Sequence, residues 1–391
     1  MELEAYWQLL LLPLFFALGW IAARVDIHHV VRESRELPRS YFQGLNFLLS
    51  EEPDKAIDAF LEVARQDTQT VELNFALGGL FRRRGEMERA IRMHQSLIER
   101  DDLGEGIRLQ ALMELGQDYL KAGLLDRAED IFVKLRTSTL KDEAQRQLLE
   151  IYQLEKDWQK AIAVAREQDD PCAAKEIAQF YCELASDELM RSRFEAAENA
   201  LEEARKAHRL CVRASLIAGD IALQQNAPEK AIDAWRRIEQ QAPAYLSLAA
   251  QRIQDACQRL GKPWEGLILL RTYLERYPSL DLLESVYQLE LENAGSDAAY
   301  RLVQNALQKN PSLLGLEKLI SARLSLVGDE GGRRADLELA RGIVHGYTRR
   351  LARYRCTGCG FRARQFYWRC PACGGWETYP PRRSEEFDAS L

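Results

Sequence analysis

The chain has 391 residues, of which 47% are apolar and 29% are charged. This length exceeds one ordinary core and the composition excludes a disordered chain, so we expect several domains or an elongated array of repeats. The formal net charge of −7 argues against general nucleic-acid binding. Only the segment from Arg349 to Leu391 is basic, with nine Arg against four acidic residues, which leaves room for a local anionic partner.

The first element is an apolar segment from Ala5 to Ala23, in which Gln8 is the only strongly polar residue. As a helix it would be about 28 Å long, close to the hydrocarbon thickness of a bilayer. Basic residues follow this segment and do not precede it, which favours an uncleaved anchor over the alternative, a cleaved signal peptide. We therefore expect a single-pass transmembrane helix over 1–23, a juxtamembrane segment over 24–39, an N-terminus outside and the bulk of the chain in the cytoplasm.

From about Ser40 to 312 the sequence repeats itself about eight times. A small residue stands near the start of an amphipathic helix in each unit, with successive gaps of 33 to 38 residues, at Ala56, Ala90, Ala128, Ala161, Ala197, Ala231, Gly266 and Ala299. Several of these anchors are followed four residues later by a bulky side chain, namely Phe60, Phe132, Leu201, Trp235 and Leu270. An ordinary helical bundle would not keep this spacing, so we expect stacked helical pairs that share one continuous core.

Four units also carry a glycine twelve residues before the anchor, at Gly44, Gly78, Gly116 and Gly219. Small residues at both places let two antiparallel helices cross closely, and this pattern resembles the tetratricopeptide repeat. The resemblance implies a curved superhelix whose concave face, lined by the first helix of each unit, binds peptides. Candidate groove residues are then Phe75, Arg82 and Gln117. After the last unit, we expect terminal helices over 313–353, with a turn or hinge from Gly328 to Asp336 and a helix up to about Arg353.

Four cysteines near the C-terminus have the spacing C-x2-C-x10-C-x2-C, at Cys356, Cys359, Cys370 and Cys373. Two residues between cysteines form a tight turn that directs both sulfurs to one ion, and four thiolates are typical of a closed structural zinc site. Gly360 and Gly374 follow the pairs, where we expect a positive φ. A redox role for the pairs would require a thioredoxin-like βαβ context, which the sequence lacks. The pairs also resemble rubredoxin, in which four thiolates hold iron, so one zinc ion is predicted with iron as the alternative.

Aromatic and arginine side chains surround the cysteines: Phe361, Arg362, Arg364, Phe366, Tyr367, Trp368, Arg369 and Trp376. They could stack on single-stranded nucleic acid. A ribbon over 354–380, followed by a tail over 381–391, has little core of its own, so we expect the rings to pack on the metal site and the repeats and expect no nucleic acid as partner. The remaining cysteines, at 172, 182, 211 and 257, are predicted to be small buried residues.

The sequence contains no phosphate-binding loop, no HExxH motif and no nucleophile elbow, so we do not expect an enzyme. The prediction is an all-α tetratricopeptide-repeat superhelix with an N-terminal transmembrane helix and a small C-terminal rubredoxin-like zinc ribbon. This order of parts, with the opening repeat YFQGLNFLLSEEPDKAIDAF and the ribbon CTGCG…CPACG, resembles the lipopolysaccharide assembly protein B family (LapB, also called YciM) of Gram-negative bacteria.

The resemblance implies a regulatory protein of the inner membrane, with a periplasmic N-terminus. Family members promote degradation of the lipid A deacetylase LpxC by the membrane-bound AAA+ protease FtsH, and associate with other inner-membrane proteins of the pathway. Two alternatives remain: a scaffold that gathers lipopolysaccharide biosynthetic enzymes without controlling proteolysis, and a rubredoxin-like electron-transfer protein. Self-association into a homo-oligomer is left open.

Overall fold

The computed structural model describes residues 39–50, 52–66, 71–168, 173–326, 332–349 and 354–383. The chain forms two compact units, Met1–Ile151 and Tyr152–Leu391. Among the described residues, no helix is both long and apolar enough to cross a bilayer, and the predicted anchor Ala5–Ala23 lies outside them.

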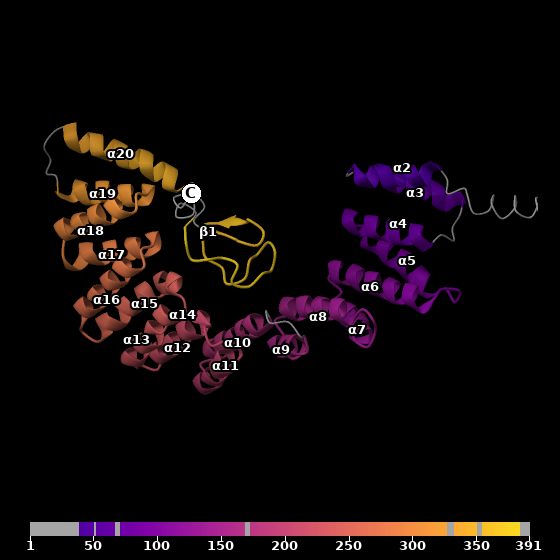
Figure 1. Ribbon diagram of the computed structural model, residues 1–391, viewed down its shortest axis with the longest axis horizontal. Helices are drawn as coiled ribbons and strands as arrows, with labels where there is room; N and C mark the ends of the chain where they lie inside the picture. Colours follow the sequence, from indigo (N-terminus) through magenta and orange to yellow (C-terminus); the bar gives the residue numbers. More distant parts are fainter. Residues whose placement is uncertain are drawn as a thin grey trace, which may run out of the picture. The chain divides into compact units, whose positions relative to one another are not determined.

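The first unit is a stack of antiparallel helical hairpins (Figure 1). Its first and second helices alternate in the order α2 (Arg39–Leu49), α3 (Pro53–Gln66), α4 (Val71–Arg84), α5 (Met87–Ile98), α6 (Glu105–Lys121) and α7 (Leu125–Leu135), and α8 (Lys141–Glu155) leads into the second unit. Each hairpin packs on the next, with α3 against α4 and α5 against α6.

The second unit continues the same pattern and ends in the ribbon. Its helices are α9 (Trp158–Arg166), α10 (Ala173–Met190), α11 (Phe194–Ala207), α12 (Val212–Gln224), α13 (Pro228–Arg236), α14 (Ile238–Gln241), η1 (Pro243–Tyr245), α15 (Leu246–Arg259), α16 (Pro263–Arg276), α17 (Leu280–Asn293), α18 (Ser296–Lys309), α19 (Leu313–Leu326) and α20 (Gly332–Thr348). Two short strands, β1 (Tyr354–Arg355) and β2 (Arg362–Ala363), pair antiparallel in the ribbon.

The predicted small anchors mark the same place in every hairpin. Each is the fourth residue of a second helix, from Ala56 in α3 to Ala299 in α18. All seven alanine anchors are completely buried and Gly266 is buried as well. The regular spacing therefore reflects one contact that is repeated in every hairpin. In this contact the two helices approach closely, because no side chain larger than a methyl group stands at the anchor.

The bulky residue one turn after the anchor fills the space over the glycine of the preceding helix. A Cβ atom on Gly116 would lie 2.6 Å from Cε1 of Phe132, and one on Gly219 would lie 2.1 Å from Nε1 of Trp235. The indole of Trp235 also donates a hydrogen bond to the carbonyl of Leu216, at 3.1 Å. Glycine is thus required because a ring occupies the volume that a Cβ would need.

Three of the scattered cysteines lie in the repeats, and the expected hinge lies near the start of α20. Cys182, Cys211 and Cys257 are buried as predicted, and Cys172 lies outside the described residues. Residues 332–336 of the expected hinge belong to α20, which begins at Gly332 and ends at Thr348, and the first part of that hinge lies outside the described residues. α19 and α20 pack together and extend the stack by a further hairpin.

Candidate metal centre and its contacts with the repeats

The four predicted cysteines come together at one end of the ribbon, where their sulfur atoms all lie within 4.8 Å of one another. The Sγ atoms of Cys356 and Cys373 are 3.8 Å apart, and those of Cys359 and Cys370 are 3.7 Å apart. A tetrahedral ion with metal–sulfur bonds of about 2.3 Å requires sulfur–sulfur distances of about 3.8 Å. The donor set therefore fits a single metal ion held by four thiolates.

The two cysteine turns have the same backbone hydrogen bonds. The N–H of Gly360 donates to the carbonyl of Cys356 at 3.0 Å, and the N–H of Gly374 donates to the carbonyl of Cys370 at 2.9 Å. Both glycines have a positive φ, 76° and 72°, as the sequence predicts. This left-handed conformation turns the chain back sharply enough for both sulfurs of a pair to face the same point.

The electrostatics of the four thiols also favour a cation among them. Burial raises the pKa of Cys356, but hydrogen bonds from Thr378 and from the N–H groups of Cys359 and Gly358 outweigh it and bring the value to about 6. The N–H of Phe361 lowers the pKa of Cys359, yet burial and the neighbouring sulfurs raise it to about 12. One thiolate thus opposes ionisation of the next, and a bound cation would remove this repulsion.

Aromatic side chains fix the ribbon to the repeats of the second unit. Trp376 makes edge contacts with Trp158 of α9 and Phe180 of α10, at ring distances of 6.5 and 6.0 Å. Its indole N–H donates to Oε1 of Gln153 at 3.1 Å. Trp368 stacks on Tyr245 at 5.6 Å with an angle of 5° between the rings. These rings pack on the repeats, as expected for a ribbon with a small core. Rings that are engaged in this way are not available to stack on the bases of a nucleic acid.

Polar contacts on the same surface come from the first helices of three repeats. The amide of Gln179 in α10 donates to Glu377 of the ribbon at 2.6 Å. The guanidinium of Arg213 in α12 lies over the rings of Trp368 and Trp376, 5.7 and 5.9 Å from their centroids. In α17, Asp281 accepts a hydrogen bond of 2.7 Å from the hydroxyl of Tyr354.

These three helix residues occupy equivalent places in their repeats. Gln179, Arg213 and Asp281 each stand eighteen residues before the small anchor of their unit. They therefore lie in the same turn of three first helices, α10, α12 and α17, on the face that receives a peptide in the tetratricopeptide pattern. The ribbon thus binds the repeats of its own unit at the positions where a repeat of this class would hold a partner.

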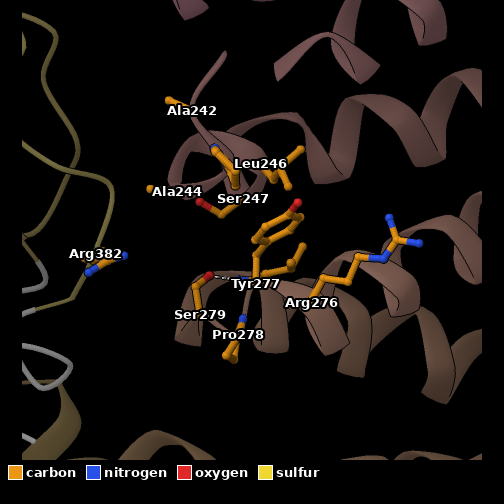
Figure 2. Close-up of a pocket in the computed structure, with 11 residues that line it drawn as sticks. Ala242, Ala244, Leu246, Ser247, Arg276, Tyr277, Pro278, Ser279 and Arg382 are labelled. Atoms are coloured by element: carbon orange, nitrogen blue, oxygen red, sulfur yellow. Dashed lines mark hydrogen bonds between the residues drawn. The ribbon is translucent and has the colours of Figure 1, made fainter. Parts of the chain in front are cut away.

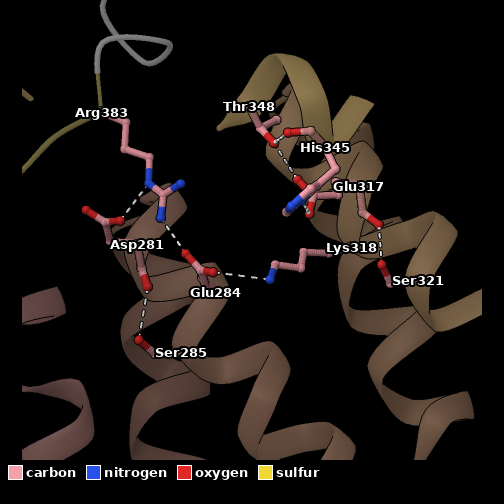
Figure 3. A network of polar contacts seen from close by, with 9 residues as sticks. All are labelled: Asp281, Glu284, Ser285, Glu317, Lys318, Ser321, His345, Thr348 and Arg383. Carbon is pink, nitrogen blue, oxygen red and sulfur yellow. Dashed lines mark hydrogen bonds and ion pairs between the residues drawn. The ribbon is translucent and has the colours of Figure 1, made fainter. Parts of the chain in front are cut away.

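The last described residues of the chain close this contact with ion pairs (Figure 3). Arg383 is 7% exposed and its Nε donates to Oδ1 of Asp281 at 2.6 Å, while its Nη2 bonds to Glu284. Lys318 of α19 reaches the other oxygen of Glu284 at 3.1 Å. Burial raises the pKa of Glu284, but the two cations outweigh burial and hold that pKa below its usual value. The cluster joins α17, α19 and the end of the ribbon.

A pocket of about 520 Å³ lies beside the ion pairs, between η1, the end of α16 and the end of the ribbon (Figure 2). Pro243, Leu246, Tyr277 and Pro278 give it mostly apolar walls, and Arg382 borders it from the segment that follows the ribbon. Arg382 is exposed, whereas the adjacent Arg383 is buried.

The three predicted groove residues lie in the first unit and have different surroundings. The guanidinium of Arg82 is engaged within the fold, donating to Asp118 at 2.9 Å and to Glu114 at 2.6 Å. Phe75 contacts the ring of His94 at 6.0 Å, and Gln117 is half-buried. Arg82 is therefore a structural residue, a role that sequence spacing alone did not reveal.

Known family models match both the repeats and the ribbon. A tetratricopeptide repeat model matches residues 43–102 and 182–245, and a rubredoxin metal binding domain model matches residues 354–381. A solved structure of the TPR2AB domain of yeast Sti1 with pHSP90 shares 16% identity and covers 69% of this chain and 96% of that one, with a TM-score of 0.29.

Two curated relatives cover nearly the whole chain. Lipopolysaccharide assembly protein B of Escherichia coli K12 is 37% identical over 96% of this chain and 97% of its own length. The protein of the same name from Haemophilus influenzae is 29% identical over 96% of this chain and 98% of its own. The sequence, the helical repeats and the four-cysteine ribbon therefore place this chain in the lipopolysaccharide assembly protein B family.

Proposed function

We propose that this protein is a non-catalytic adaptor of the inner membrane that promotes degradation of the lipid A deacetylase LpxC by the protease FtsH. Its curated relatives are named for lipopolysaccharide assembly. The observation that most directly supports an adaptor is the use of the repeats' recognition positions, at Gln179, Arg213 and Asp281, to hold the ribbon. A protein built from such surfaces acts by positioning other proteins, with no need for a reacting group of its own.

We further propose that Cys356, Cys359, Cys370 and Cys373 hold one zinc ion, with iron as the alternative. When bound, the metal supplies structural crosslinking of the two turns. Trp376 and Arg383 then hold the cross-linked ribbon on the first helices of the array. Metal analysis of protein purified from its native host separates the two ions, because an iron–sulfur centre would also give visible absorption.

The proposal includes an anchor over Ala5–Ala23 that holds the array at the cytoplasmic face of the membrane. Tethering raises the effective concentration of the adaptor beside a membrane protease, so a weak surface for a client would suffice. The proposed topology is a periplasmic N-terminus, a cytoplasmic array over 40–312 with terminal helices over 313–353, and a cytoplasmic ribbon over 354–380.

The test is the half-life of LpxC after translation is stopped, in cells that lack this protein and in cells that carry defined forms of it. We expect a longer half-life on loss, restored by the full chain but not by a form without residues 1–23 or by the variant Cys356→Ser. An unchanged half-life, with other pathway enzymes displaced from the membrane, would instead favour the scaffold that does not control proteolysis. Antibody detection of each form controls for its abundance.

A further inference from the structure

The last helix of the array, α20, has apolar side chains on two separate faces, about 120° apart around the helix axis. One face is turned towards α19, where Thr348 donates a hydrogen bond of 2.7 Å to Glu317, and half-buried Val344 falls on the same side one turn earlier. The other face carries Leu339, Ile343 and Tyr347, one turn apart, which are 66%, 56% and 65% exposed. The end of a repeat array normally presents a polar outer face, so this apolar stripe indicates an interaction surface.

Two glycines stand between the large residues of this exposed face. At 100° per residue, Gly342 and Gly346 share the face of Leu339 and Ile343. A Cβ atom on either glycine would meet nothing within 4 Å, so packing within the chain does not require glycine there. Glycine weakens a helix interior, and its remaining advantage is that it lets a second helix approach closely.

The pattern of large and small residues is complementary to itself. If a second α20 runs antiparallel about a twofold axis near Gly342, Leu339 of one helix faces Gly346 of the other, and Ile343 faces Gly342. Each contact then occurs twice, as in every interface between identical surfaces. Interlocking of large and small residues gives close packing without any rearrangement of the helix.

The charges along one edge of this face are also complementary in the antiparallel arrangement. Glu338 and Arg349 are eleven residues apart, which places them on the same side of the helix, one near each end. The twofold axis brings Glu338 of one copy beside Arg349 of the other, twice. Glu338 is 50% exposed and pairs within its own helix only with Arg334, at 3.1 Å, so it can turn to a new partner at little cost.

We propose that α20 is a dimerisation helix that packs antiparallel against α20 of a second copy of this chain. The area sets the strength of this contact. A standard stable interface uses about 20 to 30 residues from each side, whereas one face of a seventeen-residue helix offers far fewer. The dimer is therefore weak and reversible, with a dissociation constant of about a micromolar, and forms readily only where the protein is concentrated.

Sedimentation of the full chain in detergent, over a range of concentrations, measures this dimer. The decisive variant is Gly346→Leu, which adds apolar surface but blocks close approach. We expect it to weaken the dimer about tenfold or more and to leave the thermal transition unchanged or slightly higher, since the site is open. The matched control, Gly106→Leu, adds the same side chain at another open helical site and leaves the dimer unchanged. Non-specific apolar association would give the opposite result, stronger self-association of Gly346→Leu.

A charge exchange tests the register. Glu338→Arg and Arg349→Glu should each weaken the dimer, and the double variant should restore most of the loss. A chain that stays monomeric up to about 100 μM overturns the proposal. So does a monomeric chain that binds vesicles of anionic phospholipid through α20, with binding lost in Ile343→Gln, because the exposed face then serves a membrane surface.

Discussion

Replacing Arg383 with alanine tests how the ribbon is held, because its neighbour provides a matched control. The guanidinium of Arg383 is buried between two carboxylates of α17, Asp281 and Glu284. The adjacent Arg382 is exposed and points to the rim of the pocket shown in Figure 2. Arg383→Ala and Arg382→Ala remove the same charge from neighbouring positions, so the ion pairs account for any difference between the two variants.

The size of the effect follows from what Arg383 leaves behind. Removing one partner of a buried, hydrogen-bonded charge pair costs about 2 to 5 kcal/mol. The low end applies here, because Asp281 keeps the hydroxyl of Tyr354 and Glu284 keeps Lys318. A loss of about 2 kcal/mol increases the population of undocked ribbon about 30-fold. Arg382→Ala should change it by less than about 0.5 kcal/mol, as is usual for surface substitutions.

The indole N–H of Trp376 reports docking directly, because it is bonded to Gln153 across the contact. Its hydrogen exchange, followed by NMR in protein labelled at tryptophan, should be about 30-fold faster in Arg383→Ala than in Arg382→Ala. Both variants should retain the metal, since the four cysteines are unchanged. Equal exchange rates in the two variants would refute the conclusion that the ion pairs of Arg383 hold the ribbon on the repeats. Loss of metal from Arg383→Ala would refute the conclusion that metal binding does not depend on docking.

Three other results are expected. Gly78→Ala should destabilise the first unit by about 1 to 3 kcal/mol, because a Cβ there would lie 2.4 Å from a ring atom of the next helix. At the adjacent Gly79 a Cβ would meet nothing within 4 Å, so Gly79→Ala should stabilise the unit by about 0.5 to 1 kcal/mol. Thermal unfolding measures both changes. A double-mutant cycle of Tyr245→Ala and Trp368→Ala should give a coupling of about 0.5 to 1.5 kcal/mol for the stacked rings in exchange measurements, and zero coupling would contradict the stacking. Removal of the metal by a chelator should shift tryptophan emission to longer wavelength as Trp376 becomes exposed, and restored metal should reverse the shift.

Local patterns in the sequence predicted the parts of the fold that depend on neighbouring residues. The anchors are visible because each hairpin repeats the same helix crossing, and the cysteine turns are visible because their geometry depends on two intervening residues. His94 shows where such a pattern fails. It stands one turn after Ala90, where most other units carry a large apolar residue, and the structure places its ring over Gly78 with Nδ1 2.5 Å from Asp118.

The contacts that fix the ribbon could not be predicted in the same way. Trp376 meets Gln153 across 223 residues of sequence, and Tyr354 meets Asp281 across 73. A polar residue on the exposed side of an amphipathic helix has no local signature that distinguishes a contact from a solvated side chain. Only the comparison of equivalent repeat positions, once the structure shows what they touch, makes Gln179 and Asp281 recognisable as a set.

Metal binding determines the fold of the ribbon and docking determines its position. Variants that affect one or the other therefore show which of the two the proposed function requires. A segment of about thirty residues buries too little apolar surface to fold alone, so its fold depends on the metal, while its position depends on Trp376 and Arg383. Cys356→Ser removes the metal-bound fold and with it the docked position, whereas Arg383→Ala weakens docking and keeps the metal-bound fold. If both variants lengthen the half-life of LpxC alike, the adaptor requires a docked ribbon on the repeats. If only Cys356→Ser does so, the metal-bound ribbon acts as a binding surface that need not stay docked.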